Sequence, residues 1–216
     1  MSSNVQKSKS LGLVSLFLVS LFVTMVSTVP SVSAVNETSS GTITGTETWT
    51  GVMNMDGDLL VAGGAKLIIN AGTTINIPAD KNIRIEGSIC AGDSSCGASQ
   101  ASTGSPIRFI WNSPAAPAPN QTGRCYVTGV FNPDMSCGSG IYLDQTIDQS
   151  LTKLNHVTLN GAYGIPVDID GQGTIKYGAL VFDGASLSVT NPSFVDINTT
   201  NVLAINGASP TLDGGT

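Results

Sequence analysis

The alternation of apolar and polar residues changes twice along the chain. Residues 11–29 form one uncharged, mostly apolar run, whereas residues 35–48 are polar and show no regular pattern. Over residues 58–89 short runs rich in leucine and isoleucine follow one another, with clear alternation around Ile83 and Ile85. Runs of this kind, separated by glycine and proline, predict short β-strands. No window after the first apolar run carries the 3.6-residue period of a helix.

Two longer stretches interrupt this rhythm. Residues 88–105 and 112–138 are rich in glycine, serine, proline and alanine, and each contains two cysteines. Residues 106–111, which lie between them, are typical of a strand. We therefore expect two loop insertions in a regular β-scaffold.

The C-terminal third contains an internal repeat. Leu159-Asn160-Gly161-Ala162 recurs, each time after 23 residues, as Phe182-Asp183-Gly184-Ala185 and as Ile205-Asn206-Gly207-Ala208. A fixed period in this range is the signature of a stacked array. Twenty-three residues leave room for about three short strands and three turns, with equivalent strands about 4.7–4.9 Å apart. The repeat thus predicts an all-β fold, a parallel β-helix.

The same alignment predicts which side chains stack. It places Leu159 above Phe182 and Ile205 in an inward column, with a second column of Val157, Leu180 and Leu203. Further on, it aligns residues 186–189 with residues 209–212. Asn-Gly and Asp-Gly suit turns with positive φ, and stacked amides can hydrogen-bond to one another. We therefore expect a structural turn ladder of Asn160, Asp183 and Asn206 with Gly161, Gly184 and Gly207.

The first coils resemble a known family. The segments Trp49-Thr50-Gly51, Gly57-Asp58-Leu59-Leu60-Val61 and residues 65–75 are similar to the opening coils of right-handed parallel β-helix proteins of the pectate-lyase-like superfamily. The resemblance covers about residues 49–216. It implies a fold more than a function, because the family includes polysaccharide lyases, glycoside hydrolases, adhesins and large surface proteins. Its members usually have more coils, so we expect an N-terminal fragment of a longer protein.

Residues 1–34 have the organisation of an export signal. Lys7 and Lys9 precede the apolar run, and Val32-Ser33-Ala34 is typical of a cleavage site. We expect a signal peptide at 1–34, a polar linker at 35–48 and the β-helix at 49–216. The alternative is an uncleaved signal anchor, because residues 11–29 are long enough to span a bilayer.

The cysteines and glycosylation motifs fit an exported chain. An even number of cysteines in such a chain predicts disulfides, here two. We favour Cys90–Cys96 and Cys125–Cys137, since each bridge closes a short loop, although two other connectivities are open. Three Asn-x-Ser/Thr motifs mark possible glycosylation sites, at Asn36, Asn120 and Asn198.

Composition narrows the classes of partner. Only 11% of residues are charged and the net charge is -6, so the chain lacks the basic stripe that binds nucleic acid. The resemblance implies polysaccharides or cell-surface glycans as partners. We expect membrane contact only through residues 11–29, if they are retained.

Asp168 and Asp170 are the catalytic candidates, because they lie two residues apart on one predicted strand face. The resemblance implies calcium-binding carboxylates with a Lys or Arg base in a lyase, or paired carboxylates in a hydrolase. The aligned positions one period later are Asn191 and Ser193, so no carboxylate stack develops, and a solvent-facing pair is the simpler interpretation. The candidate bases are Arg108, Arg124, Lys153 and Lys176.

Other candidates for ligand binding are few. Asp56-Gly57-Asp58 is a further candidate for calcium, as the start of a calcium loop, but it lacks the remaining ligands of such a loop and predicts a turn. His156 is the only histidine, and we expect it to be structural or on the surface. Trp111, at a strand end, is the better candidate for stacking on a sugar ring than Trp49. We expect no other metal site and no cofactor.

These features favour one function and leave a second open. The first is an exported, non-enzymatic scaffold or adhesin-like module, secreted or on the cell surface. The alternative is the N-terminal part of a secreted polysaccharide lyase or glycoside hydrolase.

Overall fold

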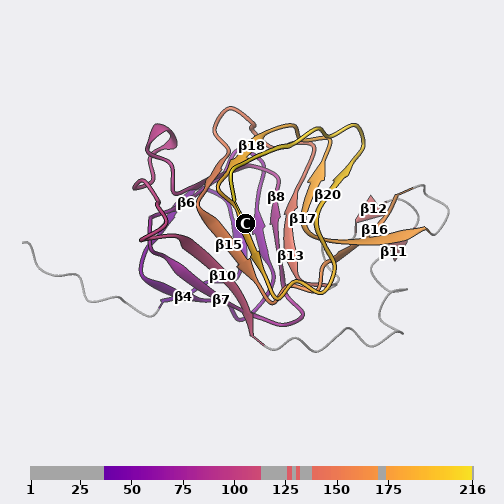
Figure 1. Cartoon of the computed structure of the whole chain (residues 1–216), viewed down its shortest axis with the longest axis horizontal. Coiled ribbons are helices and arrows are strands. Elements are labelled where there is room, and N and C mark those ends of the chain that lie inside the picture. The colour runs from indigo at the N-terminus through magenta and orange to yellow at the C-terminus, as the bar shows by residue number, and fades with distance from the viewer. Residues whose placement is uncertain (1–36, 113–125, 128–129, 132–137, 170–173, 216) are drawn as a thin grey trace, which may run out of the picture. The chain divides into compact units, whose positions relative to one another are not determined.

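The computed structural model describes residues 37–112, 126–127, 130–131, 138–169 and 174–215 (Figure 1). The chain divides into two units, residues 1–33 and 34–216, and the first lies outside the described residues. The predicted signal segment, residues 1–34, therefore lies outside the described residues. No helix in the described part of the chain is long and apolar enough to cross a membrane.

The described residues are almost entirely β-structure, arranged mainly in three sheets whose strands are parallel, apart from one antiparallel edge strand in the second sheet and a separate short antiparallel pair. Sheet I contains β1 (Glu37–Thr38), β4 (Val52–Asn54), β7 (Thr74–Pro78), β10 (Ile107–Asn112), β15 (Val157–Asn160) and β19 (Ser193–Val195). Sheet II contains β2 (Gly41–Ile43), β5 (Leu59–Val61), β8 (Asn82–Ile85), β13 (Gly140–Leu143), β17 (Ile175–Asp183) and β20 (Thr200–Ile205). Sheet III contains β3 (Thr46–Trp49), β6 (Lys66–Ile69), β9 (Ser88–Ala91), β14 (Lys153–Asn155), β18 (Ser188–Thr190) and β21 (Thr211–Asp213).

Consecutive strands of the chain visit the three sheets in turn, so each set of three forms one coil. Hydrogen-bonded side chains of adjacent coils are 22 residues apart for Asn54 and Asn76, and 23 for Asp183 and Asn206. Strand pairing in each sheet joins each inner coil to the coils before and after it. The predicted all-β class is confirmed, and the stacked parallel sheets fit a parallel β-helix.

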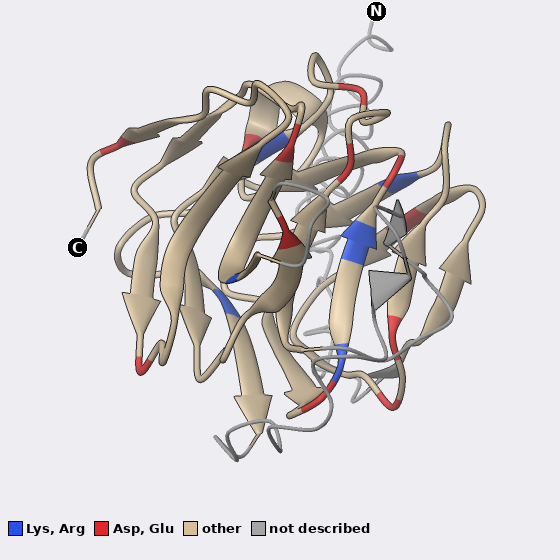
Figure 2. Cartoon of the chain, turned by 90° about the vertical axis from the view of Figure 1, so that its right-hand side faces the viewer, with Lys and Arg blue, Asp and Glu red and all other residues tan. Residues whose placement is uncertain are grey.

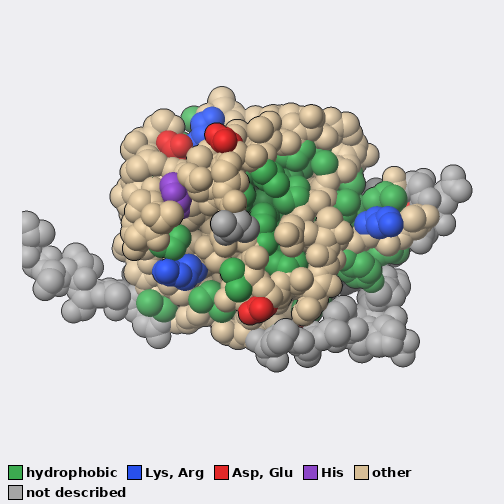
Figure 3. All heavy atoms as spheres, viewed as in Figure 1, with side chains coloured by type: hydrophobic (Ala, Val, Ile, Leu, Met, Phe, Trp, Pro, Cys, Tyr) green, Lys and Arg blue, Asp and Glu red, His purple; other side chains and the backbone are tan. Residues whose placement is uncertain are grey.

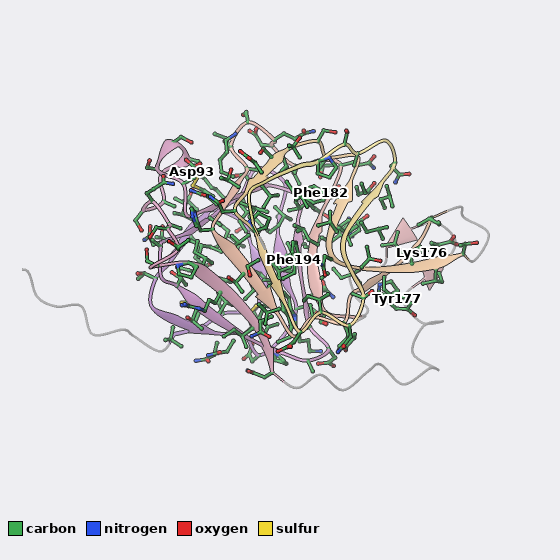
Figure 4. All side chains as sticks on the ribbon, in the orientation of Figure 1. Asp93, Lys176, Tyr177, Phe182 and Phe194 are labelled. Carbon is green, nitrogen blue, oxygen red and sulfur yellow. A yellow bond between two sulfur atoms is a disulfide. The ribbon has the colours of Figure 1, made fainter. Side chains whose placement is uncertain are left out.

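Alternation along each strand builds the core. In β7 and β8, Ile75, Ile77, Ile83 and Ile85 point inward and are fully buried. Polar neighbours such as Asn76 and Arg84 lie on the opposite face, because successive side chains of a strand alternate between faces. Phe182, labelled in Figure 4, belongs to the same buried core.

The corner between sheets III and I is made by residues in the left-handed region. Gly92 has φ 66°, His156 has φ 49°, Asn191 has φ 48° and Gly214 has φ 70°. The backbone of successive corners is joined directly, since the amide of His156 donates to the carbonyl of Thr190 at 2.8 Å. Glycine adopts this conformation freely, and other residues adopt it at a cost.

The polar segment expected as a linker forms most of the first coil. β2 and β3 pair with β5 and β6, and Ile43 and Trp49 are buried. The expectation of a patternless linker at residues 35–48 was wrong for the described residues. A strand pairs with the adjacent coil through backbone hydrogen bonds. A single inward apolar side chain in the strand is therefore enough for it to pack on that coil.

The first predicted loop begins later than expected. Residues 88–91 form β9, whose Ile89 and Ala91 are buried, and the loop extends from Gly92 to the start of β10. Of the second predicted loop, the structure describes the short antiparallel pair β11 (Tyr126–Val127) and β12 (Val130–Phe131).

The predicted side-chain columns are wrong, and in sheet II Phe182 stacks on Ala204 and Leu180 on Val202, not on Ile205 and Leu203. Leu159 lies in sheet I and pairs with Phe109 and Phe194, whereas Phe182 lies in sheet II and pairs with Leu143 and Ala204. The antiparallel strand β16 (Ile165–Asp168), which pairs with the start of β17, lies between them and lengthens this coil. The alignment of residues 186–189 with 209–212 is correct, since Val189 pairs with Leu212.

Candidate functional site

A network of polar side chains crosses the outer face of sheet II. Arg84 of β8 pairs with Tyr142 of β13, so both side chains lie in one outward column. Glu86 lies two residues after Arg84, and Asp144 lies two residues after Tyr142. Asp183 lies in the next coil. We call this set, with Asn206 beyond β20, the outer network.

Arg84 connects the first part of the network. Its Nη2 lies 2.7 Å from Oδ2 of Asp144 and 3.0 Å from Oε1 of Glu86. The guanidinium carbon also lies 5.6 Å from the centre of the Tyr142 ring, within the range of a cation–π contact. On its other oxygen, Asp144 accepts hydrogen bonds from the amide and hydroxyl of Thr146.

Tyr142 and Asp183 continue the network into later coils. The Tyr142 hydroxyl donates to Oδ2 of Asp183 at 2.6 Å, and Nδ2 of Asn206 donates to Oδ1 of the same carboxylate at 2.6 Å. Burial of Tyr142 and its contact with the Asp183 carboxylate raise the pKa of the phenol well above its ordinary value. Tyr142 therefore stays protonated and acts as a donor.

The two buried aspartates of the outer network are paired with side chains of other coils. Each of the two buried aspartates, Asp144 and Asp183, accepts hydrogen bonds or an ion pair from side chains of another coil. Buried charge that is paired in this way stabilises one arrangement of the backbone, because loss of one partner leaves the other desolvated. Among the described residues no group of three acidic, histidine or cysteine side chains is placed to hold a metal ion.

The sequence alone did not reveal this network. Arg84 and Asp144 are 60 residues apart, and Tyr142 and Asp183 are 41 apart, so neither pair follows the 23-residue period. The long insertions between these strands conceal their common register. The alternation of outward polar residues along β8 and β13 was the available signal. Figure 2 shows acidic positions at several strand ends, with few basic positions among them.

The predicted turn ladder is formed in part. Asp183 and Asn206 are joined by the hydrogen bond described above. Asn160 lies in sheet I, where it pairs with Ile110 and Val195, and so it does not stack on Asp183. Gly161, Gly184 and Gly207 all have positive φ, as their turns require. A separate amide pair, Asn54 with Asn76 at 2.9 Å, was not predicted.

Of the predicted catalytic pair, Asp168 lies away from the position that the alignment gave it. Asp168 ends β16 and pairs with Ile175 in an antiparallel hairpin, outside the regular coil. Asp170 lies outside the described residues, as does the candidate base Arg124. Of the other bases, Arg108 and Lys176 are exposed, and Lys153 is half-buried. Figure 4 shows Lys176 and Tyr177 on the hairpin strand that projects from sheet II.

Both tryptophans pack inside the protein. Trp111 is 3% exposed, and its indole N–H donates to the carbonyl of Lys81 at 2.8 Å. Trp49 is also buried, and its indole donates to Glu47. The proposal that Trp111 stacks on a sugar is therefore not supported, because inward alternation along β10 buries its ring.

The first cysteine pair closes a loop over sheet III. Cys90 and Cys96 are joined by a disulfide. Cys96 and Ala98 pack with Ile68, and Nζ of Lys66 donates to the carbonyl of Cys96 at 2.6 Å. Asp93 caps the short turn after β9, and the hydrogen bond from Ser95 lowers its pKa. Figure 4 marks Asp93 on this loop. Cys125 and Cys137 lie outside the described residues.

The remaining candidates occupy turns. Asp58 accepts a hydrogen bond from the amide of Asn82 in the next coil, and Asp56 is exposed. His156 occupies the corner described above, where Nδ1 lies 2.9 Å from Oδ1 of Asn155. Of the glycosylation motifs, Asn198 is exposed, whereas Asn36 and Asn120 lie outside the described residues.

The fold defines the class of protein as an all-β chain of stacked parallel sheets. Comparison of the chain with protein-family models, with curated proteins and with solved structures finds no match. The functional argument therefore depends on the outer network and on the faces of the three sheets.

Proposed function

We propose that this chain is an exported, right-handed β-helix that serves as a non-enzymatic scaffold or adhesin-like module at the cell surface. The observation that carries the proposal is the outer network. Its two buried aspartates are engaged in contacts between coils, so the most strongly charged feature of sheet II joins the stack together. The role of the coils is to hold their faces and loops in fixed positions.

The surface chemistry supports contact with glycans. The outward positions of sheet I are mostly hydroxyl and amide side chains, such as Thr74, Asn76, Thr158 and Asn160. Groups of this kind both donate and accept hydrogen bonds, as sugar hydroxyls do. The Cys90–Cys96 bridge supports export, because disulfides persist in oxidising compartments.

A polysaccharide lyase or glycoside hydrolase is the second candidate, and one observation favours it. Arg84 lies beside Asp144 on the outer face of sheet II, which brings together a base and a carboxylate of the types such enzymes use. In this second candidate the ion pair opens when a sugar chain binds.

A degradation assay separates the two candidates. The full chain is incubated with acidic and neutral polysaccharides, and new reducing ends and unsaturated products are measured. The scaffold proposal expects no product, with retained binding on a glycan array. Turnover that Arg84→Lys removes and Arg108→Lys leaves intact would establish the enzyme instead; Arg108 is exposed on sheet I and serves as the matched control.

A further inference from the structure

The outer surface of the first coil carries an unbroken series of hydroxyl side chains. Between residues 40 and 50 every second residue is a serine or a threonine, and each of these residues is exposed. We call this series the hydroxyl belt: Ser40, Thr42, Thr44, Thr46, Thr48 and Thr50. Residues between them, such as Ile43 and Trp49, point into the core, because successive side chains of a strand alternate between its faces.

The belt is a property of the first coil and is not repeated in the second. The positions of the second coil that pair with belt residues in β2 and β3 carry an aliphatic side chain, a lysine and a second aliphatic side chain, at Leu60, Lys66 and Ile68. Outward positions of these two sheets therefore accept several kinds of side chain. Threonine suits a strand, but so do valine, isoleucine and tyrosine. Strand formation by itself does not account for a hydroxyl at every outward position.

The belt hydroxyls differ in their contacts from those of the other hydroxyl-rich segment, the loop at residues 92–105. In that loop the Ser95 hydroxyl donates to Asp93 at 2.6 Å, and the Ser99 hydroxyl accepts from a backbone amide at 2.8 Å. No belt hydroxyl makes a hydrogen bond with another described side chain or backbone group; in the first coil Ser39, which points inward, makes one. The belt oxygens are thus open to a molecule from outside.

Hydroxyl groups also dominate the polarity of this coil. Glu47 is the one charged residue between positions 40 and 50, and it is half-buried. Charge is scarce elsewhere too, at 11% of residues, and on the face seen in Figure 3 charged side chains occupy a few separate places. A neutral, strongly hydrated group attached to the belt would supply the hydration that charged side chains supply in most proteins.

We propose that the hydroxyl belt is a site of O-linked glycosylation. The proposal rests on export, which is part of the proposed function, and adds a covalent modification to it. Acceptor residues on one strand are about 6.5 Å apart, so neighbouring positions hold their sugars side by side. Sugars are bulky and hydrophilic, and segments rich in serine and threonine are frequent acceptors of O-linked chains.

The reaction is a glycosyl transfer catalysed by a transferase of the exporting cell. A threonine Oγ1 attacks the anomeric carbon of a sugar phosphate ester. The new carbon–oxygen bond forms as the bond between that carbon and the phosphate oxygen breaks. The hydroxyl proton passes to a base of the transferase, and the phosphate leaves with the electron pair of the broken bond.

Mass spectrometry of the exported chain, purified from the cells that produce it, tests the proposal. The intact mass is measured before and after alkaline β-elimination, which releases O-linked sugars, and fragmentation that retains the sugars locates them. We expect hexose on most of the belt residues and little on the loop at residues 92–105, which has a similar content of serine and serves as the internal control. A bare belt, phosphate in place of sugar, or equally dense sugar on the loop overturns the proposal.

Two variants at the same positions separate the hydroxyl from the strand. In one variant Thr42, Thr44, Thr46 and Thr48 are changed together to valine, which keeps the branched shape and removes the hydroxyl. In the other they are changed to serine, which keeps the hydroxyl. We expect the valine variant to lose the sugar of these positions and the serine variant to retain it, with both folded by circular dichroism. Equal sugar content in the two variants overturns the proposal.

The result also distinguishes this proposal from the function on which it rests. An exported chain with a bare belt contradicts the glycosylation alone and leaves the scaffold proposal intact. A chain that stays inside the cell overturns both.

Discussion

Tyr142 is the residue at which the two parts of the outer network meet. Its ring lies against Arg84, and its hydroxyl donates to the buried carboxylate of Asp183. Tyr142→Phe leaves that oxygen without its donor, so we expect the free energy of unfolding to fall by about 1.5–3 kcal/mol. Guanidinium denaturation measures the change. Tyr177→Phe, on the hairpin, is the control, and an equal loss there would contradict the assigned role.

The same tyrosine predicts a response to alkaline pH. Burial and Asp183 raise the pKa of Tyr142 in the folded state above the ordinary 10.0. Its contribution to stability is therefore complete below pH 10 and is lost as the pH rises above that value. We expect the wild type to lose stability above pH 10 more steeply than Tyr142→Phe. Parallel slopes in denaturation at several pH values would show that Tyr142 is not responsible.

His156 owes its position to backbone geometry. With φ 49° it adopts the left-handed conformation that Gly92 supplies at the equivalent corner. A β-branched residue tolerates this conformation poorly, so His156→Val is expected to lower stability by about 1–2 kcal/mol. His156→Gly is expected to leave it unchanged or raise it. Thermal melting compares the two variants, and similar losses in both would point to the imidazole itself.

At the scale of elements, local patterns predicted strands better than their partners. Alternation around Ile75 and Ile83 correctly identified β7 and β8. The repeat identified the β18–β21 pairing but placed Leu159 over Phe182, because the inserted strand β16 gives that coil extra length without breaking the sequence match. Pairing in a stack depends on the length of every insertion, and a single sequence does not show which residues leave the stack.

The outer network was hidden for the same reason. Its members are brought together by parallel pairing of β8, β13 and β17, between which the chain makes long excursions. A search for two carboxylates close together in the sequence finds Asp168 and Asp170 instead. The outward positions of each predicted strand, taken together, would have retained Arg84 and Tyr142 as candidates.

We expect the disulfide in the loop after β9 to contribute to the stability of the protein. Cys90 and Cys96 close a short loop whose turn also binds Lys66. Replacing both cysteines by serine removes the constraint on the unfolded chain, and for a loop of this size we expect a loss of about 2 kcal/mol. Guanidinium denaturation of the double variant measures it. An unchanged midpoint would mean that the loop's other contacts hold it without the bridge.

At the scale of the whole described stack, stability is expected to vary from coil to coil. Inner coils have paired strands on both sides and fully buried columns, whereas the last coil has open edges and an exposed Leu212. Amide hydrogen exchange should therefore be slow in β8, β13 and β17 and faster in β20 and β21. Uniform protection along the stack would contradict a coil-by-coil gradient.

The architecture of the whole stack explains the low content of charged residues. Only 11% of residues are charged because alternate positions face a continuous core and the corners favour glycine and asparagine. Of the charges that remain, Arg84 and Asp144 form an ion pair between coils.

The direction of the hydrogen bonds also determines how the stack responds to tension. In all three sheets these bonds lie along the stacking direction, so a pull at one end concentrates load on the outermost coil while the others stay relaxed. The chain would then peel away one coil at a time at low force, in the manner of a zipper. Each step would release the contour length of one coil together with its insertion, so the sequence of step lengths would record the order of the loops.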